Sequence, residues 1–512
     1  MRAAQLKAVL PRELLASVVV FLVALPLCMG IAIASGMPPA KGLITGIVGG
    51  LVVGWLAGSP LQVSGPAAGL AVLVFELVRQ HGIAMLGPIL LLAGLLQLIA
   101  GRLRLGCWFR VTAPAVVYGM LAGIGVLIVL SQIHVMFDGA PLPSGLDNLL
   151  GFPEALGKAL PMVGGGLGWQ AGLLGLLTIL VMWLWEKFKP HSLRFVPGAL
   201  LGVGLATLVS LVLALPVKRV EVPDNLAQAI DWLRPADLLN LADPALLIAA
   251  FAVAFIASAE TLLSAAAVDR MHDGQRSDFD RELSAQGIGN MLCGLLGALP
   301  MTGVIVRSSA NVQAGARTRL STIFHGLWLL AFVLLLSSVL QSIPVASLAG
   351  VLVYTGLKLV DLKVYRGLSR YGRMPMLTYA VTALAIIFTD LLTGVLIGFG
   401  LTLAKLAWKA SRLKVSLVDL PGEGEKELRL TGAATFLKVP ALTQVLATVP
   451  PGSTVHVPLN NLTYIDHSCL ELLEEWGRAN AAKGSRLVIE SRGLKRRLEG
   501  RLRTTTGIGS TA

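Results

Sequence analysis

The sequence predicts a polytopic α-helical membrane protein of about 14 spans, arranged as two inverted halves of seven and followed by a small α/β domain. Of the 512 residues, 55% are hydrophobic and only 14% are charged, a composition outside the range of soluble globular domains. Apolar stretches long enough to cross a hydrocarbon core of about 30 Å recur from Leu14 to about Trp408. Two of these stretches, far apart in the chain, are interrupted by glycine and proline.

The first interruption lies at Leu61–Val74, with the sequence LQVSGPAAGLAVLV. Pro60 and Pro66 stand here in an otherwise apolar run. No continuous helix passes through them, because proline lacks an N–H and clashes with the carbonyl four residues before it. We therefore expect a short strand and then a half-helix that begins near Pro66, inside the membrane.

A second interruption of the same kind lies at Gly297–Val312, with the sequence GALPMTGVIVRSSANV. Both half-helices would direct free N–H groups and a positive dipole end toward the membrane interior. Paired interruptions in corresponding halves are typical of a transporter that holds its substrate near the bilayer midplane. Helix N-termini attract negative charge, so the expected cargo is an anion.

The two halves are predicted at about 13–215 and 244–408, within a transmembrane domain of residues 1–410, and a polar segment at Val217–Asp243 joins them. One face of the second span consists of Gly42, Gly46, Gly50, Gly54 and Gly58. Such a face permits close helix packing in lipid. A glycine-containing helix at Gln286–Gly297 also precedes the second interruption, so the same order occurs twice. With seven spans per half, the second half starts on the opposite side of the membrane, which makes the repeat inverted.

Lysine and arginine concentrate at the helix ends that are predicted to face the cytoplasm. The formal net charge is +13, but its placement follows the positive-inside rule, so no nucleic-acid partner is expected. Arg2, Lys7 and Arg12 precede the first span, which lacks a signal-peptide cleavage site. The outer loops hold only Lys41, Arg79, Lys158, Lys218, Arg219 and Arg234. Together with the even span count, this pattern places both termini in the cytoplasm.

The composition changes after Lys414. LKVSLVDL, KELRL, TVHVPLNN and SRLVIE show strand-like alternation, whereas CLELLEEWGRANAA has apolar residues at helical spacing. We predict a cytoplasmic α/β domain at 415–501, in which GLKRRLEGRLR forms a basic helix. The tail at 502–512 is predicted to be disordered.

Four motifs carry a resemblance to a known family: SGPAAG (Ser64–Gly69), ETLLS (Glu260–Ser264), RELSAQGIGN (Arg281–Asn290) and LPMTGVIVRSSANVQAGARTRLS (Leu299–Ser321). The chain resembles the SulP inorganic anion transporters, and its C-terminal region resembles the STAS domain that this family usually carries. PLCMGIA, VRSSANVQAGAR and YIDHSCLEL look closest to bacterial members that are often linked with carbonic anhydrase and proposed to carry bicarbonate.

The resemblance implies seven plus seven inverted spans, divided into a core domain and a gate domain. It also implies a homodimer in a bacterial inner membrane, with carbonic anhydrase as one partner besides the lipid bilayer. The implied function is secondary active transport of a small inorganic oxyanion, coupled to Na⁺ or H⁺, with no other cofactor.

Glu260 is the strongest candidate for a functional residue inside the membrane. It lies in an otherwise uncharged span, where a carboxylate costs at least about 2.5–3.5 kcal/mol. The resemblance implies an acidic residue here, near the bound anion. Ser264, one turn later, and Thr302 would add oxygens that suit Na⁺, whereas a desolvated Glu260 could equally bind H⁺. The alternative is a structural or interfacial Glu260.

Arg307 lies one turn into the second half-helix, where it would attract an anion at long range; the alternative is that it snorkels to the cytoplasmic surface. The resemblance implies an arginine near the anion pocket. The other substrate-binding candidates act through backbone N–H groups, for which small residues allow a close approach, with plain helix packing as the alternative. They are Ala67, Ala68, Gly69, Thr302 and Gly303, and Val304 is also assigned to substrate binding.

Other functional classes fit the sequence less well. A membrane enzyme would need a clustered nucleophile and base or a set of metal ligands, and the sequence contains no such constellation. A sensor would not need an intramembrane Glu260. A nucleobase or dicarboxylate permease of the same fold, or an anion exchanger or channel, stays as the alternative. The residues do not separate bicarbonate from sulfate, because both are small oxyanions that N–H donors can bind.

Overall fold

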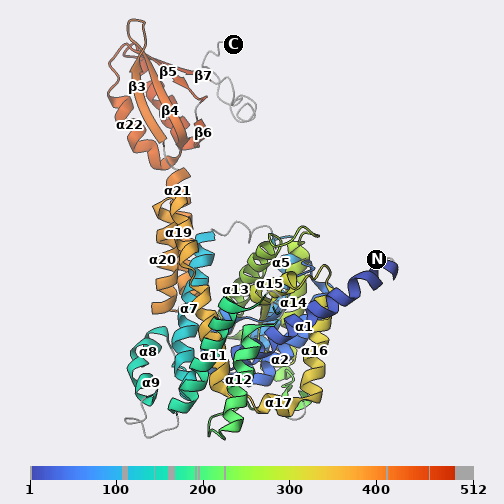
Figure 1. The fold of residues 1–512 in the computed structure, drawn as a ribbon. Coiled ribbons are helices and arrows are strands. Elements are labelled where there is room, and N and C mark those ends of the chain that lie inside the picture. The colour runs from blue at the N-terminus through green and yellow to red at the C-terminus, as the bar shows by residue number, and fades with distance from the viewer. Residues whose placement is uncertain are drawn as a thin grey trace. The chain divides into compact units, whose positions relative to one another are not determined.

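The computed structural model describes residues 3–106, 114–142, 144–159, 168–190, 193, 196–223, 226–410, 413–460 and 462–490. The chain divides into two compact units, Met1–Phe399 and Gly400–Ala512, and each is described by itself (Figure 1). Helix α21 (Leu391–Ala410) runs through the division. The predicted basic helix at GLKRRLEGRLR and the predicted tail at 502–512 lie outside the described residues.

The first unit is almost entirely helical. Its helices are α1 (Ala3–Ala34), α2 (Pro39–Val48), α3 (Gly54–Leu56), α4 (Ala71–His81), α5 (Ile83–Arg102), α7 (Pro114–Met136), α8 (Gly145–Leu150), α9 (Phe152–Ala159), α11 (Gly168–Phe188), α12 (Gly198–Val212), α13 (Pro244–Val268), α14 (Phe279–Leu295), α15 (Ile305–Gln313), α16 (Leu320–Leu335), α17 (Ser337–Gln341), α18 (Val345–Leu359), α19 (Leu362–Leu368) and α20 (Arg373–Phe388). Among the described residues, seven helices are long and apolar enough to cross a membrane, and four further apolar helices are shorter. The polytopic helical fold is thus confirmed, whereas the count of about 14 spans stays a prediction.

The helices of this unit form two groups (Figure 1). In one group, α5 packs against α13 and α14, and α1 packs against α2, α15 and α16. In the other, α7 packs against α18 and α20, and α11 packs against α12 and α18. Helix α1 also contacts α18 and α12, so it connects the two groups.

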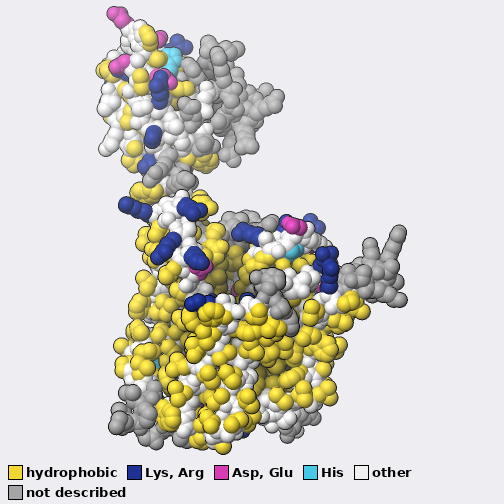
Figure 2. Space-filling view, viewed as in Figure 1, with side chains coloured by type: hydrophobic (Ala, Val, Ile, Leu, Met, Phe, Trp, Pro, Cys, Tyr) yellow, Lys and Arg dark blue, Asp and Glu magenta, His cyan; other side chains and the backbone are white. Residues whose placement is uncertain are grey.

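The outer surface of the first unit is apolar. Figure 2 shows hydrophobic side chains over most of the visible face, with Lys and Arg gathered along its upper rim. Leu176, Leu208 and Phe251 are among the exposed residues, at 50%, 57% and 62% of their accessible area. A soluble monomer rarely exposes so extensive an apolar surface, so this face is suited to lipid.

The predicted glycine face of the second span forms a close helix contact. A Cβ on Gly50 would lie 2.5 Å from the Cα of Gly326 in α16, and a Cβ on Gly326 would lie 2.9 Å from the Cα of Gly50. Neither position can hold a larger residue unless a backbone moves. Within this span the helix widens into a π-helical segment at Gly49–Val53.

The segment between the halves packs onto the helix ends. The Val220 N–H donates to the Ile343 carbonyl at 2.9 Å, and Val220 is only 2% exposed. Lys41, itself 3% exposed, forms an ion pair with Asp231 at 2.7 Å. This pair lies beside Gly297, because a Cβ on Gly297 would approach both residues.

The second unit contains a mixed five-stranded sheet. Its strands are β3 (Leu413–Asp419), β4 (Glu425–Ala434), β5 (Thr454–Pro458), β6 (Leu462–Ile465) and β7 (Arg486–Glu490), and its helices are α22 (Val439–Ala447) and α23 (His467–Ala481). The order is β3-β4-β5-β7, with β6 also on β4; only β3 is antiparallel to its neighbour. Alternating residues of β4 and β5 form a separate apolar core with Leu442 and Leu473.

We expect this unit to fold without the membrane part, because its apolar core is its own. Residues 411–512 expressed alone should unfold cooperatively on heating. In that fragment Leu473→Ala should lower the free energy of unfolding by about 2–5 kcal/mol, because Leu473 is fully buried. Glu475→Ala, at an exposed position on the same helix, should change it by less than about 0.5 kcal/mol. Circular dichroism on heating measures both changes, and a fragment without a cooperative transition would contradict independent folding.

Candidate functional site

The two interruptions meet as a pair of short antiparallel strands. Strand β1 (Ser64–Pro66) lies beside β2 (Met301–Gly303), with Gly65 opposite Thr302. A 3₁₀ turn at Ala68–Leu70 and α4 follow β1, and α15 follows β2. The predicted strand and half-helix are therefore present at both sites, and the two half-helices begin beside one strand pair.

Side-chain hydrogen bonds from α14 hold β2 in place. The Asn290 side-chain amide donates to the Met301 carbonyl at 3.1 Å, and its oxygen accepts from the Met301 N–H at 2.7 Å. The same amide also donates to the Gln97 side-chain oxygen at 2.8 Å. One turn earlier in α14, Gln286 donates to the Ser64 hydroxyl at 2.6 Å. All four polar residues are buried, so these bonds fix the strands where no water competes.

Polar side chains of α15 hold the chain before β1. The Ser308 hydroxyl accepts from the Val63 N–H at 2.9 Å, and Asn311 donates to the Leu61 carbonyl at 3.0 Å. No role was expected for Asn290, Gln286, Ser308 or Asn311. A sequence signal was present for Gln286 and Asn290, because Glu282, Gln286 and Asn290 recur every fourth residue and so share one face of a helix.

One residue of helix α13, Thr261, contacts both interruptions. The Thr261 hydroxyl accepts from the Gly303 N–H at 3.1 Å, and the Thr261 carbonyl accepts from the Gln62 side chain at 3.0 Å. The preceding residue, Glu260, reaches the start of the first half-helix: a Cβ on Gly69 would lie 2.8 Å from its Oε2. Any larger residue at position 69 would displace this carboxylate.

Glu260 is half-buried, and α13 continues for two more turns beyond it. Its Oε2 is buried and has no hydrogen-bond partner among the described residues. Ser264 follows one turn later and is 7% exposed. The Thr302 hydroxyl is fully buried and also lacks a partner within the described part of the chain, so it bonds neither Glu260 nor Ser264.

Arg307, in the first turn of α15, is fully buried, so it does not snorkel to the surface. Its guanidinium lies against Gly65, where a side chain would overlap it. Gly65 and Thr302 are directly opposite in the strand pair, so the Thr302 side chain lies on the face that Arg307 covers. Cys28 of α1 and His325 of α16, both buried, are neighbours of the guanidinium.

None of the guanidinium nitrogens of Arg307 has a hydrogen-bond partner, and no carboxylate pairs with them, among the residues that the structure describes. A buried arginine normally has such a partner, because an uncompensated buried charge is strongly unfavourable. The site therefore holds a positive charge that has no counter-ion in the part of the chain that the structure describes.

Two N–H groups among the substrate-binding candidates already have partners. The Gly303 N–H donates to Thr261, and the Val304 N–H donates to the Val63 carbonyl at 2.9 Å. Both N–H groups therefore bond within the protein in this structure, and the assignment of Gly303 and Val304 to substrate binding stays a prediction. The first turn of α15 leaves free N–H groups further along, beginning at Ile305. At the first half-helix, Ala67 and Gly69 are buried and Ala68 is partly exposed.

The model that describes the sulfate permease family matches residues 10–382 of this chain. "Putative sulfate transporter YvdB" of Bacillus subtilis is 29% identical over 394 residues, which cover 76% of this chain and 72% of that protein. "Bicarbonate transporter BicA" of Synechocystis is 28% identical over 409 residues, which cover 75% and 68%.

Solved structures agree with this match. The transmembrane domain of a cyanobacterial bicarbonate transporter BicA superposes with a TM-score of 0.65 at 26% identity, covering 75% of this chain and 97% of that domain. The structure of SLC26A9 superposes with a TM-score of 0.77 and covers 97% of this chain and 87% of its own; at 16% identity it shows the fold alone. The matched segment, the paired interruptions and the fold lead to one conclusion: this chain belongs to the sulfate permease family of membrane transporters.

Proposed function

We propose that this protein is a secondary active transporter of bicarbonate or sulfate that works by alternating access and is coupled to Na⁺ or H⁺. The observation that carries the proposal is the buried guanidinium of Arg307, which has no counter-ion among the described residues and lies beside two helix starts. The printed names of YvdB and BicA, a sulfate and a bicarbonate transporter, support these two anions.

The anion would bind where three positive features converge. The N-terminal turns of α4 and α15 each contribute a partial positive charge of about 0.5. Arg307 adds a full charge behind the strand pair, and its attraction is strong because little water screens it. Ala68 and Val304 are partly exposed, so they mark the side from which an anion could approach Ala67, Gly69 and the first turn of α15.

The coupling ion would bind at Glu260, with Ser264 and Thr302 as further oxygen ligands if that ion is Na⁺. The support is the buried Oε2 of Glu260 and the buried hydroxyl of Thr302, both without a partner within the described residues. The contact between Glu260 and Gly69 would then make the first half-helix sensitive to whether the carboxylate holds a cation.

The proposal also includes a membrane location, an oligomeric state and a partner protein. The distribution of Lys and Arg supports a multi-pass protein with both termini in the cytoplasm. The similarity to bacterial proteins such as YvdB supports the bacterial inner membrane as its location. The second unit, whose sheet is compatible with a STAS domain, would serve in a homodimer. Carbonic anhydrase is the enzyme partner that bicarbonate transport would favour.

Purified protein in liposomes tests the proposal. Uptake of labelled bicarbonate and of labelled sulfate is measured with a Na⁺ gradient, with a pH gradient, with both and with neither. We expect one of the two anions to accumulate and one gradient to drive it. Accumulation of a nucleobase or a dicarboxylate instead would favour a permease of another substrate class, and exchange without any cation dependence would contradict coupling through Glu260.

A further inference from the structure

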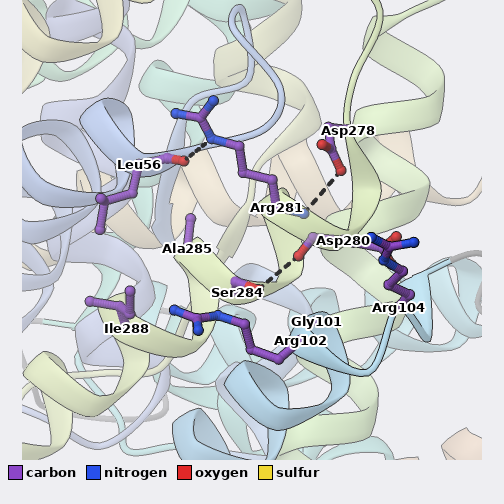
Figure 3. Close-up of a pocket in the computed structure, with 10 residues that line it drawn as sticks. All are labelled: Leu56, Gly101, Arg102, Arg104, Asp278, Asp280, Arg281, Ser284, Ala285 and Ile288. Carbon is purple, nitrogen blue, oxygen red and sulfur yellow. Dashed lines mark hydrogen bonds between the residues drawn. The ribbon is translucent and has the colours of Figure 1, made fainter.

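A cavity of about 690 Å³ lies at one end of the helices, away from the paired interruptions. It is formed where α3 and α5 end and where α14 begins, and its lining includes Arg102 and Arg281. In Figure 3 both side chains extend to the same side of α14 as Leu56, Ala285 and Ile288. One side of the cavity thus combines two guanidinium groups with an apolar floor.

No carboxylate of the described residues forms an ion pair with Arg102 or Arg281. Arg102 has no hydrogen bond or ion pair with any described residue, and Arg281 uses only its Nε, which donates to the Leu56 carbonyl at 2.8 Å. Arg281 also lies in the first turn of α14, where the helix dipole disfavours a cation. Both guanidinium groups therefore have N–H donors available for an anion.

Two aspartates line the cavity, but backbone groups already occupy them. Asp278 caps α14 by accepting from the Arg281 N–H at 3.1 Å, and Asp280 accepts from the Gly106 N–H at 2.9 Å. Figure 3 places both on the other side of the helix from the two guanidinium heads. Their charges stabilise the helix start and leave the Arg102–Arg281 side positive.

An apolar stripe leads up to this cavity. Leu95 and Ile99 on α5 and Leu103, directly after its end, recur every fourth residue and are 43%, 46% and 65% exposed. Trp55, 63% exposed, lies at the end of α3, and its carbonyl accepts from Arg319. Exposed tryptophan beside arginine is typical of the membrane–water interface. An acyl chain along α5 would bring a headgroup to Arg102.

We propose that this cavity binds the phosphate group of an anionic phospholipid of the surrounding leaflet. Arginine is suited to this group because its planar donor pair matches phosphate oxygens. Basic recesses between membrane helices on the inner side are a known setting for such headgroups. Bound lipid would connect α5 to α14, and Asn290 of α14 forms the hydrogen bonds that hold β2.

The full-length protein in detergent is titrated with phosphatidylglycerol or phosphatidylcholine, and bound lipid is counted by native mass spectrometry. Arg102→Gln with Arg281→Gln should weaken phosphatidylglycerol binding by about fivefold for each arginine removed and leave phosphatidylcholine binding unchanged. Arg102→Lys with Arg281→Lys should retain most of the binding. The matched control, Arg370→Gln with Arg373→Gln, removes two exposed arginines elsewhere and should bind as the native protein does.

Three outcomes would overturn the proposal. Equal phosphatidylglycerol binding by the native protein and the Arg102/Arg281 glutamine variant would show that the cavity is not the site. Equal losses in both glutamine variants would show an unspecific charge effect. The third outcome concerns inorganic phosphate at about 10 mM. If it raises the melting temperature of the native protein but not of the Arg102→Gln variant, and phosphatidylglycerol does not bind, the anion would come from solution and not from the membrane.

Discussion

Glu260→Gln is expected to abolish gradient-driven accumulation of the anion while the protein stays folded. Glutamine keeps the size and the hydrogen-bonding oxygen of the side chain but cannot bind a proton or balance a Na⁺ ion. The amide oxygen of glutamine can still accept from the Gly69 backbone beside it, and the exchange removes a charge that is costly inside a membrane. Initial uptake in liposomes under the driving gradient should fall by at least about tenfold, whereas thermal stability should be equal or higher.

A matched control is Glu76→Gln in α4, because the hydrogen bond of its carboxylate in the described structure comes from the exposed Gln80, at 3.1 Å. That variant should accumulate the anion normally. Comparing the native protein with the Glu260 variant under a Na⁺ gradient alone and under a pH gradient alone identifies the ion: it is the one whose gradient drives uptake in the native protein and not in the variant. Native-level accumulation by Glu260→Gln would exclude Glu260 from coupling.

The sequence was sufficient to locate the interruptions, because proline fixes the backbone at Pro66 and glycine permits the left-handed conformation at Gly297, where φ is 60°. It was also sufficient to single out Glu260 and Arg307, since charges in apolar spans are rare. In contrast, which N–H groups stay free depends on tertiary partners. Thr261 occupies the Gly303 N–H, and no local pattern reveals that α13 reaches β2.

In the C-terminal unit, too, the elements that depend on tertiary partners could not be predicted from the sequence. The alternation in TVHVPLNN and SRLVIE predicted β5 and β7, and the spacing in CLELLEEWGRANAA predicted α23. Neither β6 nor α22 was predicted from the sequence. Strand β6 has only four residues, too few for alternation to stand out, and it is stabilised by pairing with β4. Such elements depend on contacts that are remote in sequence.

Replacing Arg307 should weaken transport of the anion without lowering the stability of the protein. Arg307→Met keeps much of the side-chain volume and removes a buried charge that has no counter-ion among the described residues. Exchange of buried charges for apolar groups is often neutral or stabilising, by about 1–4 kcal/mol. We therefore expect an unchanged or raised melting temperature in detergent, together with an apparent KM for the anion raised by about tenfold or more, because the long-range attraction is lost.

Arg307→Lys gives the complementary result. Its ammonium restores the charge but not the planar donor pair, so uptake should recover only in part. Arg370→Gln, which removes an exposed arginine remote from the interruptions in the chain, controls for overall charge and should leave KM unchanged. A lowered melting temperature with unchanged KM in Arg307→Met would mean that the guanidinium serves the packing of α1, α15 and α16. A raised KM in a protein that is at least as stable would mean that the fold tolerates an unpaired charge because the substrate itself supplies the counter-ion.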